Sequence, residues 1–303
     1  MSISPKKPLK NKLIIILGPT SSGKSDLAVK LAKKLNGEVI SADSRQVYKG
    51  LDLTSGKITP KEMASVPHHL LDVVSLQKTF TVSDFKKLGQ SAIKDILSRR
   101  KLPIICGGTA FYIDALIYNQ SFPEVLPNKA LRQKLSQQST ESLFKQLKKL
   151  DPARAKTIDP KNKVRLIRAL EIILTTNSPV PALKKQSPYQ VLKIGIKKDP
   201  TELKQRIHTR ILKRIKQGMI KEIENLHQKK RISWRRLEEL GLECRYLSLH
   251  LQNKLTKSEM LQKLETETNH YAKRQLTWWK GDSDIHWIQK ENEALRLAQD
   301  FLN

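Results

Sequence analysis

The sequence predicts an α/β fold in which a P-loop-type parallel sheet flanked by helices carries a helical insertion domain. The apolar run 13–17 (LIIIL) leads directly into the spacing G-x-x-x-x-G-K-[ST], typical of a phosphate-binding loop between a strand and a helix. Short apolar runs and amphipathic segments alternate over the N-terminal third, as they do in parallel sheets. The stretch 119–186 is instead Lys-rich and helical in pattern, with prolines at its joints. We therefore expect a core formed by 1–118 and 187–303 and an insertion domain over 119–186.

Four apolar runs are predicted to be strands of the sheet: 13–17, 38–42 (EVISA), 102–106 (LPIIC) and 189–196 (YQVLKIGI). Unbroken apolar runs of this length are typical of strands that are buried on both faces. Because strand–helix–strand order implies parallel strands, we expect a ligand at their carboxyl ends. Gly107-Gly108 lets the chain turn sharply where the third run ends.

The helices of the N-terminal third have recognisable start and stop signals. A short amphipathic helix is predicted over 26–35, where Asn36-Gly37 ends it. Thr59-Pro60-Lys61-Glu62 is a capping box with proline at the first helical position, so a second helix begins there. Thr81 and Asp84 form a similar signal for a third helix.

A long helix is predicted to begin at Asp199, in the C-terminal part of the chain. Its apolar residues recur every four positions and form a stripe that should face the core. The stripe consists of Leu203, Ile207, Ile211, Ile215, Met219 and Ile223. Arg206, Arg210 and Arg214 form a parallel row beside it.

The composition excludes several classes of protein. Lys and Arg number 57 against 29 Asp and Glu, for a formal charge of +28. This excess is typical of proteins that bind nucleic acid or anionic membranes, although a solvated basic surface would also account for it. The two cysteines, Cys106 and Cys244, indicate neither a disulfide framework nor a zinc module. Only five apolar residues precede the glycine loop, too few for a signal peptide or a membrane span, so we expect a soluble, cytoplasmic protein.

Residues 18–25 are predicted to hold a diphosphate. In such a loop, backbone N–H groups and a helix N-terminus surround the anion, as in ATP-binding proteins. Lys24 would neutralise the outer oxygens, and the hydroxyl of Ser25 would be a ligand of Mg²⁺. The diphosphate-binding residues are Gly18, Pro19, Thr20, Ser21, Ser22, Gly23, Lys24 and Ser25.

Asp43 provides a carboxylate at a neighbouring strand end. An ATPase of this class has an aspartate after a second buried strand, but here 102–106 is followed by Gly-Gly-Thr. Asp43 is our candidate for the base that accepts a proton from an attacking nucleophile; alternatively, it caps the turn after its strand. Two enzyme classes fit, a kinase of a nucleotide or small metabolite and a transferase whose leaving group is diphosphate. A nucleotide-gated RNA-binding protein is the alternative outside enzymes.

Five stretches resemble, in order, the motifs of the bacterial tRNA dimethylallyltransferase family (isopentenyl-diphosphate:tRNA transferases). They are 41–57 (SADSRQVYKGLDLTSGK), 67–75 (PHHLLDVVS), 107–116 (GGTAFYIDAL), 164–172 (VRLIRALEI) and 272–279 (AKRQLTWW). The resemblance implies transfer of a dimethylallyl group from dimethylallyl diphosphate to N6 of adenosine 37, next to the tRNA anticodon, with release of pyrophosphate. It also implies a monomer without a membrane partner, whose C-terminal helices bind tRNA.

The resemblance further assigns roles to residues of this chain. Asp43 would take the proton of the exocyclic amine, a poor nucleophile because its lone pair is delocalised into the ring. Lys24, Thr109 and Arg210 would complete the catalytic set, with Arg206, one helical turn away, as the alternative to Arg210. The tRNA-binding residues would be Asp43, Ser44, Arg45, Gln46, Thr109, Val164, Arg165, Leu166, Ile167, Arg168, Lys273 and Arg274.

Some positions depart from the family pattern or have competing interpretations. The departures are Thr54-Ser55-Gly56-Lys57 and 241–246 (GLECRY). His68-His69 could hold a metal ion, but adjacent residues of a strand face opposite sides, which favours a hydrogen-bonding role. Trp278 and Trp279 could stack on bases, although packing in the core is expected.

Overall fold

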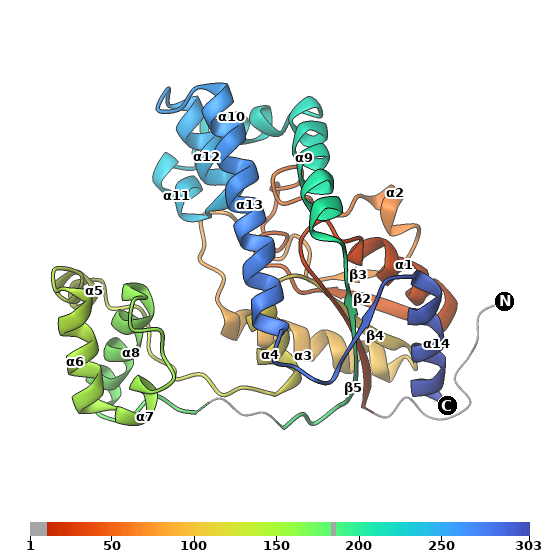
Figure 1. The fold of residues 1–303 in the computed structure, drawn as a ribbon, viewed down its shortest axis with the longest axis horizontal. Helices are drawn as coiled ribbons and strands as arrows, with labels where there is room; N and C mark the ends of the chain where they lie inside the picture. The colour runs from red at the N-terminus through yellow and green to blue at the C-terminus, as the bar shows by residue number, and fades with distance from the viewer. Residues whose placement is uncertain (1–10, 183–185) are drawn as a thin grey trace. The chain divides into compact units, whose positions relative to one another are not determined.

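The computed structural model describes residues 11–182 and 186–303. The chain forms two compact units, Met1–Asn119 with Ser187–Asn303, and Gln120–Gln186. The larger unit contains the sheet and the C-terminal helices, and the described part of the smaller unit contains helices but no strand (Figure 1). That the larger unit is catalytic and that the smaller one acts as an insertion domain stay predictions.

The larger unit is built on a six-stranded parallel sheet, which confirms the predicted fold class. The strand order is β3-β2-β4-β1-β5-β6. The strands are β1 (Lys12–Leu17), β2 (Gly37–Ser41), β3 (His68–His69), β4 (Leu102–Cys106), β5 (Gln190–Ile196) and β6 (Ile285–Ile288). The four predicted strands are present, whereas β3 and β6 were not predicted, because runs of two and four residues are too short for the sequence to indicate a strand.

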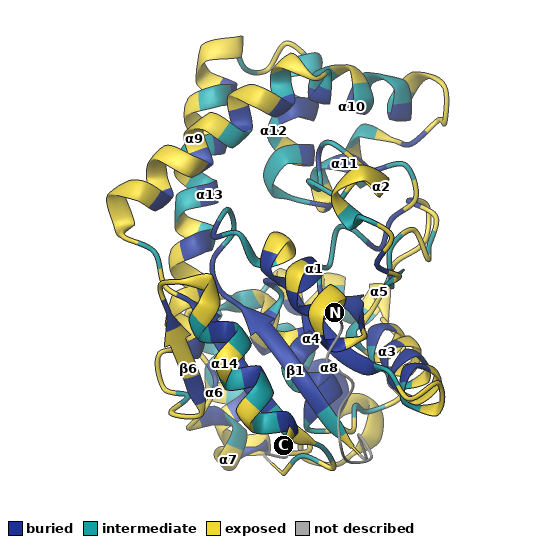
Figure 2. Ribbon diagram, turned by 90° about the vertical axis from the view of Figure 1, so that its right-hand side faces the viewer, coloured by how far each residue is buried: buried dark blue, intermediate teal, exposed yellow. Residues whose placement is uncertain are grey.

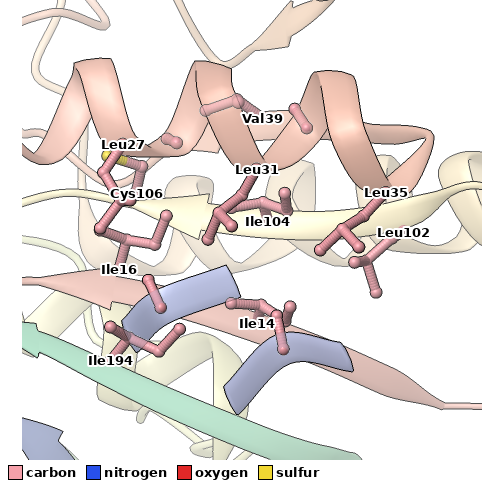
Figure 3. Packing of buried hydrophobic residues seen from close by; sticks show 14 of the residues in the cluster. Ile14, Ile16, Leu27, Leu31, Leu35, Val39, Leu102, Ile104, Cys106 and Ile194 are labelled. Carbon is pink, nitrogen blue, oxygen red and sulfur yellow. The ribbon is translucent and has the colours of Figure 1, made fainter. Parts of the chain in front are cut away.

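One face of the sheet packs on two helices from opposite ends of the chain. Ile14, Ile16 and Ile104 contact the apolar faces of α1 (Lys24–Leu35) and α14 (Glu291–Leu302) (Figure 3). Replacing Ile14 with Ala would cost about 2–5 kcal/mol, since it removes buried apolar atoms and leaves a cavity that the surrounding residues fill only in part. This packing holds α1, which begins at the end of the phosphate-binding loop, against the sheet.

The other face carries the alternate residues of the same strands. Leu13 and Ile15 pack against α3 (Val82–Ser98) and α4 (Ala110–Ile117). β1 is therefore buried on both faces, as its unbroken apolar run predicts (Figure 2). The sheet is a rigid platform for the loops that follow its strands.

The C-terminal helices enclose a second core. They are α9 (Pro200–Lys216), α10 (Met219–Gln228), α11 (Trp234–Glu239), α12 (Leu242–Leu251) and α13 (Lys257–Trp279). Val47, Tyr48 and Leu51, from the chain that follows β2, complete this core. The helices are thereby joined to the carboxyl side of the sheet.

The prediction of one long helix after Asp199 is wrong in its extent. α9 ends at Lys216, and Gly218 (φ 103°) starts α10 from the left-handed region. The predicted apolar stripe nevertheless contacts a single core, because both helices pack on it. A period of four residues therefore continued by coincidence across a helix boundary.

The predicted capping boxes are confirmed. The hydroxyl of Thr59 accepts the amide of Glu62 at the start of α2 (Pro60–Met63), and Glu62 accepts the Thr59 amide in return. Thr81 and Asp84 make the same reciprocal pair at the start of α3.

The smaller unit has its own core. Its helices are α5 (Lys129–Ser136), α6 (Thr140–Leu150), α7 (Pro152–Ala155) and α8 (Lys163–Thr176). Leu143, Leu147 and Leu166 lie at its centre. Glu171 is fully buried and accepts hydrogen bonds from Arg132 at 2.8 and 2.7 Å, which satisfies a charge that would otherwise be costly to bury.

No helix in the described ranges is long and apolar enough to cross a membrane. Cys106 and Cys244 are both buried and free of a disulfide.

Candidate active site

Three loops meet at the carboxyl edge of the sheet because β4 lies between β1 and β2. They are the phosphate-binding loop 18–25 after β1, the loop with Asp43 after β2, and Gly107-Gly108-Thr109 after β4. They border a cavity of about 160 Å³, whose other walls come from α9, α12 and α13. The sequence-predicted residues Lys24, Asp43 and Arg210 all line this cavity.

The phosphate-binding loop has the backbone that its glycines permit. Gly18 (φ 147°) lies so close to β5 that a Cβ would be 3.1 Å from the carbonyl oxygen of Ile196. Gly23 (φ 96°) precedes the first turn of α1. The hydroxyl of Ser22 is buried with no hydrogen-bond partner among the described residues. An unpartnered buried hydroxyl inside such a loop fits an anion-binding role.

The charged groups beside this loop are predominantly cationic. Nζ of Lys24 donates a hydrogen bond of 2.7 Å to the carbonyl oxygen of Pro19. Loss of solvation lowers the pKa of Lys24 to about 8, and the positive charge of Arg210 acts in the same direction. Loss of solvation is the main cause that lowers the pKa of Arg210 to about 10, and the positive charge of Arg214 adds to it. Since three cations crowd one site, an anion bound there would stabilise all of them.

Asp43 both turns the chain and faces the cavity. Its Oδ1 accepts hydrogen bonds from the backbone amides of Arg45 at 2.7 Å and Gln46 at 3.3 Å, the turn-capping role considered as the alternative. Its Oδ2 has no hydrogen-bond partner among the described residues. One oxygen therefore fixes the carboxylate, and the other can accept a proton.

The Gly-Gly-Thr loop is shaped by close contacts with its neighbours. A Cβ on Gly107 would lie 2.2 Å from the carbonyl oxygen of Ala42, so no larger residue fits. Oγ1 of Thr109 accepts the backbone amide of Ser44 at 3.1 Å. Thr109 therefore holds the residue that follows Asp43.

Arg210 and Arg214 extend from α9 over the loop 51–57. Arg210 donates to the carbonyl oxygen of Gly56 at 3.3 Å, and Arg214 donates to the carbonyl oxygen of Leu53 at 3.2 Å. Gly56 (φ 60°) lies against the same arginine, since a Cβ built on it would be 2.4 Å from a guanidinium nitrogen of Arg210. Glu222 accepts three successive amides of the same loop, at 2.7 to 3.0 Å.

A second hollow, of about 450 Å³, lies on the other side of the phosphate-binding loop. It shares Lys24, Ser25, Ile58 and Arg210 with the first cavity. Arg206 borders only this second hollow, and its Nε donates to Glu202 at 2.8 Å. Of the two arginines considered for the diphosphate, Arg210 alone faces both spaces.

The predicted tRNA-binding residues fall into two groups in the larger unit. Ser44, Arg45 and Gln46 line the cavity beside Asp43. Lys273 and Arg274 are exposed on α13, where the Arg274 guanidinium lies 5.9 Å from the ring centre of Tyr271.

The predicted tRNA-binding residues of the smaller unit are less uniform. Val164 and Arg165 are exposed on α8. Leu166 is fully buried in the core of this unit, and Ile167 packs against the same core. Arg168 is bonded to Glu171 and to the carbonyl oxygen of Val125. The side chain of Leu166 is therefore not exposed to an RNA, whereas those of Ile167 and Arg168 are half-buried, and tRNA binding by this segment stays a prediction.

The histidine pair and the tryptophan pair each divide between two environments. The ring of His69 pairs with Glu38 at 2.7 Å, and that of His68 bonds the carbonyl oxygen of Val66 at 2.8 Å. No group of three or more potential metal-ligating side chains occurs within 11–182 and 186–303. Trp279 is in the core as expected, but the expectation is wrong for Trp278, which is 44% exposed.

Sequence reasoning missed several residues that line the cavity. Gln275, Thr268 and Tyr271 project from α13, and Arg214 and Glu243 from neighbouring helices. For Thr268 and Gln275 a signal exists, since each is a polar residue at a position of the apolar stripe of α13.

Comparison with known proteins identifies the family. A sequence model described as IPP transferase matches residues 46–282. The chain belongs to the IPP transferase family. Relatives in this family include tRNA dimethylallyltransferase 1 of Geotalea uraniireducens, 40% identical over 296 residues, covering 96% of each chain. The tRNA dimethylallyltransferase of Anoxybacillus flavithermus is 38% identical over 288 residues, covering 94% of this chain and 92% of the relative.

Solved structures of IPP transferases have the same fold. A full-length tRNA isopentenylpyrophosphate transferase from Bacillus halodurans has a TM-score of 0.72 and 33% identity, over 96% of this chain and 95% of that one. A eukaryotic dimethylallyltransferase, described as acting on tRNA, has a TM-score of 0.80 and 26% identity over 96% and 79%. The resemblance detected in the sequence motifs is confirmed.

Proposed function

We propose that this protein transfers a dimethylallyl group from dimethylallyl diphosphate to the exocyclic N6 of adenosine 37, next to the anticodon of tRNA. One observation carries the proposal: Asp43, which keeps one carboxylate oxygen without a hydrogen-bond partner among the described residues, lines the same cavity as the cations Lys24 and Arg210. The carboxylate suits an amine that must lose a proton, and the cations suit a diphosphate that must leave.

The reaction places each of these residues in a role. The N6 atom attacks the allylic carbon, the carbon–oxygen bond to the diphosphate breaks, and Oδ2 of Asp43 accepts the proton from the nitrogen. Negative charge grows on the departing oxygen, where Lys24, Arg210 and the loop amides can stabilise it. Thr109 holds the Asp43 loop through Ser44 at 3.1 Å.

The phosphate-binding loop fits a Mg²⁺ ion through a single side chain. Ser25 borders both hollows at the start of α1, and Mg²⁺ in such sites is bound by one or two protein ligands together with phosphate oxygens. The ion would supply additional charge stabilisation for the leaving pyrophosphate.

The basic charge of the protein is the reason to expect tRNA as its partner. We propose that a monomer holds the RNA backbone through exposed cations, including Lys273 and Arg274 of the C-terminal helices and Arg165 of the insertion domain. Ser44, Arg45 and Gln46 would then contact a base unstacked into the cavity. The partner is RNA rather than a membrane, and a cytoplasmic setting follows from that substrate.

A single assay tests the proposal against its alternatives. The protein is incubated with Mg²⁺, unmodified tRNA and either dimethylallyl diphosphate or ATP, and the phosphate products and the RNA mass are measured. We expect pyrophosphate together with RNA that has gained one isoprenoid group. A kinase would instead form ADP and phosphorylate an acceptor, and a gated RNA-binding protein would hydrolyse ATP.

Two lysines of α1 provide the matched variants. Lys24→Ala should abolish transfer, because the charge on the leaving oxygen is then uncompensated. Lys33→Ala should leave it unchanged, since Lys33 is exposed in the last turn of the same helix. Formation of ADP with no isoprenoid added to the RNA would overturn the proposed function.

A further inference from the structure

The buried face of α13 contains an amide that an apolar stripe would not require. The buried residues of this helix are Met260, Leu264, Thr268, Ala272, Gln275 and Trp279. Gln275 is only 5% exposed. Because burying a glutamine amide without partners is unfavourable, its hydrogen bonds indicate why it is there.

Gln275 joins two of the loops that border the cavity. Its Oε1 accepts the backbone amide of Thr20 at 2.8 Å, and its Nε2 donates to the carbonyl oxygen of Gly108 at 2.8 Å. The partners fix the orientation of the amide, since only its oxygen can accept and only its nitrogen can donate. One side chain therefore sets the separation of the phosphate-binding loop and the Gly-Gly-Thr loop.

Gly108 leaves room for this contact. The three heavy atoms nearest to a Cβ built on Gly108 all belong to Gln275, and Nε2 is only 2.1 Å away. The second glycine of the Gly-Gly-Thr motif is therefore matched to a glutamine 167 positions later in the chain.

We propose that Gln275 is a positioning residue for the transfer reaction, and this inference rests on the proposed function. On one side it holds Thr20, next to Pro19, which bonds Lys24 at 2.7 Å. On the other side it holds Gly108, next to Thr109, which bonds the Ser44 amide beside Asp43. Gln275 thus sets the distance between the leaving diphosphate and the base-bound amine. A displacement of about 1 Å between reacting groups can cost about a hundredfold in rate.

Two substitutions separate positioning from folding. Gln275→Met keeps a similar length and removes both hydrogen bonds. Gln275→Glu keeps the acceptor for Thr20 but has no donor for Gly108. This variant tests the contact if Gln275→Met does not fold. Single-turnover transfer is measured with enzyme in excess over tRNA, and with enzyme and dimethylallyl diphosphate both at saturating concentrations, so that an unfolded fraction does not change the rate constant. We expect a decrease of about 10- to 100-fold, as for other groups that orient catalytic residues, with tRNA affinity unchanged.

Gln252 provides the matched control. Its Nε2 donates to Glu238 at 2.8 Å and to the carbonyl oxygen of Ser248 at 3.1 Å, and it does not line the cavity. Gln252→Met should lower the melting temperature and leave the single-turnover rate constant unchanged.

A double variant tests the contact itself. Gly108→Ala should slow transfer by displacing Gln275. The double variant, Gly108→Ala with Gln275→Ala, should be no slower than the slower of the two single variants, because both changes break the same contact. A wild-type rate constant in both Gln275→Met and Gln275→Glu would overturn the inference, as would equal losses in Gln275→Met and Gln252→Met. If the unaltered protein transfers no isoprenoid at all, the proposed function fails instead.

Discussion

The hydroxyl of Thr109 accepts the backbone amide of Ser44 at 3.1 Å, which joins the Gly-Gly-Thr loop to the residue after Asp43. Neighbouring parallel strands make this contact possible, because β2 and β4 are paired from Gly37 to Ser41. The amide of Thr109 also donates to Ala42 at 3.2 Å. The carboxylate of Asp43 is thus held from both sides of the strand end.

Asp43→Asn should remove the base and keep its geometry. The Oδ1 atom of Asn can accept the same amides of Arg45 and Gln46, so the turn should remain. Turnover should decrease by about 10²- to 10⁴-fold, the usual contribution of general-base catalysis, with tRNA affinity little changed. Steady-state kinetics and a binding titration measure the two effects.

Asp199→Asn is the control for this substitution. Asp199 also accepts two backbone amides, at 2.8 and 3.1 Å, at the start of α9 and away from the cavity. It should leave turnover unchanged. If Asp43→Asn abolished tRNA binding while turnover at saturation stayed near that of the unaltered protein, Asp43 would be a contact residue and not the base.

The two arginines of α9 should differ in their effect on the diphosphate. Arg210→Ala removes a cation that faces both hollows, so affinity for dimethylallyl diphosphate should fall about 10- to 100-fold. Arg206→Ala should have little effect, because Arg206 is exposed and paired with Glu202. Equilibrium binding of the diphosphate to each variant checks this; a larger loss in Arg206→Ala would reverse the assignment.

Sequence patterns predicted the parts of the fold that depend on neighbouring residues. The capping boxes at Thr59 and Thr81, and the glycine loop, are signals within eight residues of chain. The break between α9 and α10 was missed because a four-residue period ran through Gly218. Gly218 was itself the available signal, since its φ of 103° suits a helix boundary.

The candidate site depends on contacts that no local pattern contains. Gln275 meets Thr20 across 255 positions, and Nε1 of Trp278 donates to Asp114 at 2.9 Å across 164 positions. In α8 the motif from which tRNA binding is predicted supplies both surface residues and core residues such as Leu166. A motif indicates which segment matters, but the packing decides which of its side chains are available.

Binding of pyrophosphate should weaken above about pH 8. The pKa of Lys24 in the folded protein is lowered from 10.5 to about 8, so the free lysine is protonated below pH 8 and largely neutral above it. A bound diphosphate favours the charged form, so above pH 8 binding must take up a proton. Affinity should then fall by up to about tenfold per pH unit until the pKa of the complex is reached.

Calorimetry in buffers of different ionisation enthalpy measures this proton directly. Near one proton should be taken up at pH 9 and near none at pH 7. Unfolding has the opposite dependence, because the unfolded lysine keeps its proton up to pH 10.5, so the contribution of Lys24 to stability should rise between pH 8 and 10.5. Equal proton uptake at pH 9 in Lys24→Met would assign the effect to another group.

Phosphate contacts should make tRNA binding steeply dependent on salt. The formal charge of +28 provides many cations, and each phosphate they neutralise releases counterions, so log affinity should fall linearly with log salt concentration. Replacing Lys273 and Arg274 by Ala should make the slope shallower by about 1.4, at about 0.7 for each contact with single-stranded RNA. Affinity for dimethylallyl diphosphate should not change, since neither residue borders either hollow.

The matched control replaces Lys33 and Lys34 by Ala. These residues carry the same charge but lie in the last turn of α1. Since α1 begins at the phosphate-binding loop and runs back along the sheet, its last turn lies at the opposite edge from the cavity. The slope should therefore stay as in the unaltered protein. An affinity independent of salt would remove tRNA phosphates as the reason for the basic surface, and equal changes in the two double variants would mean that α13 has no special role in holding the RNA.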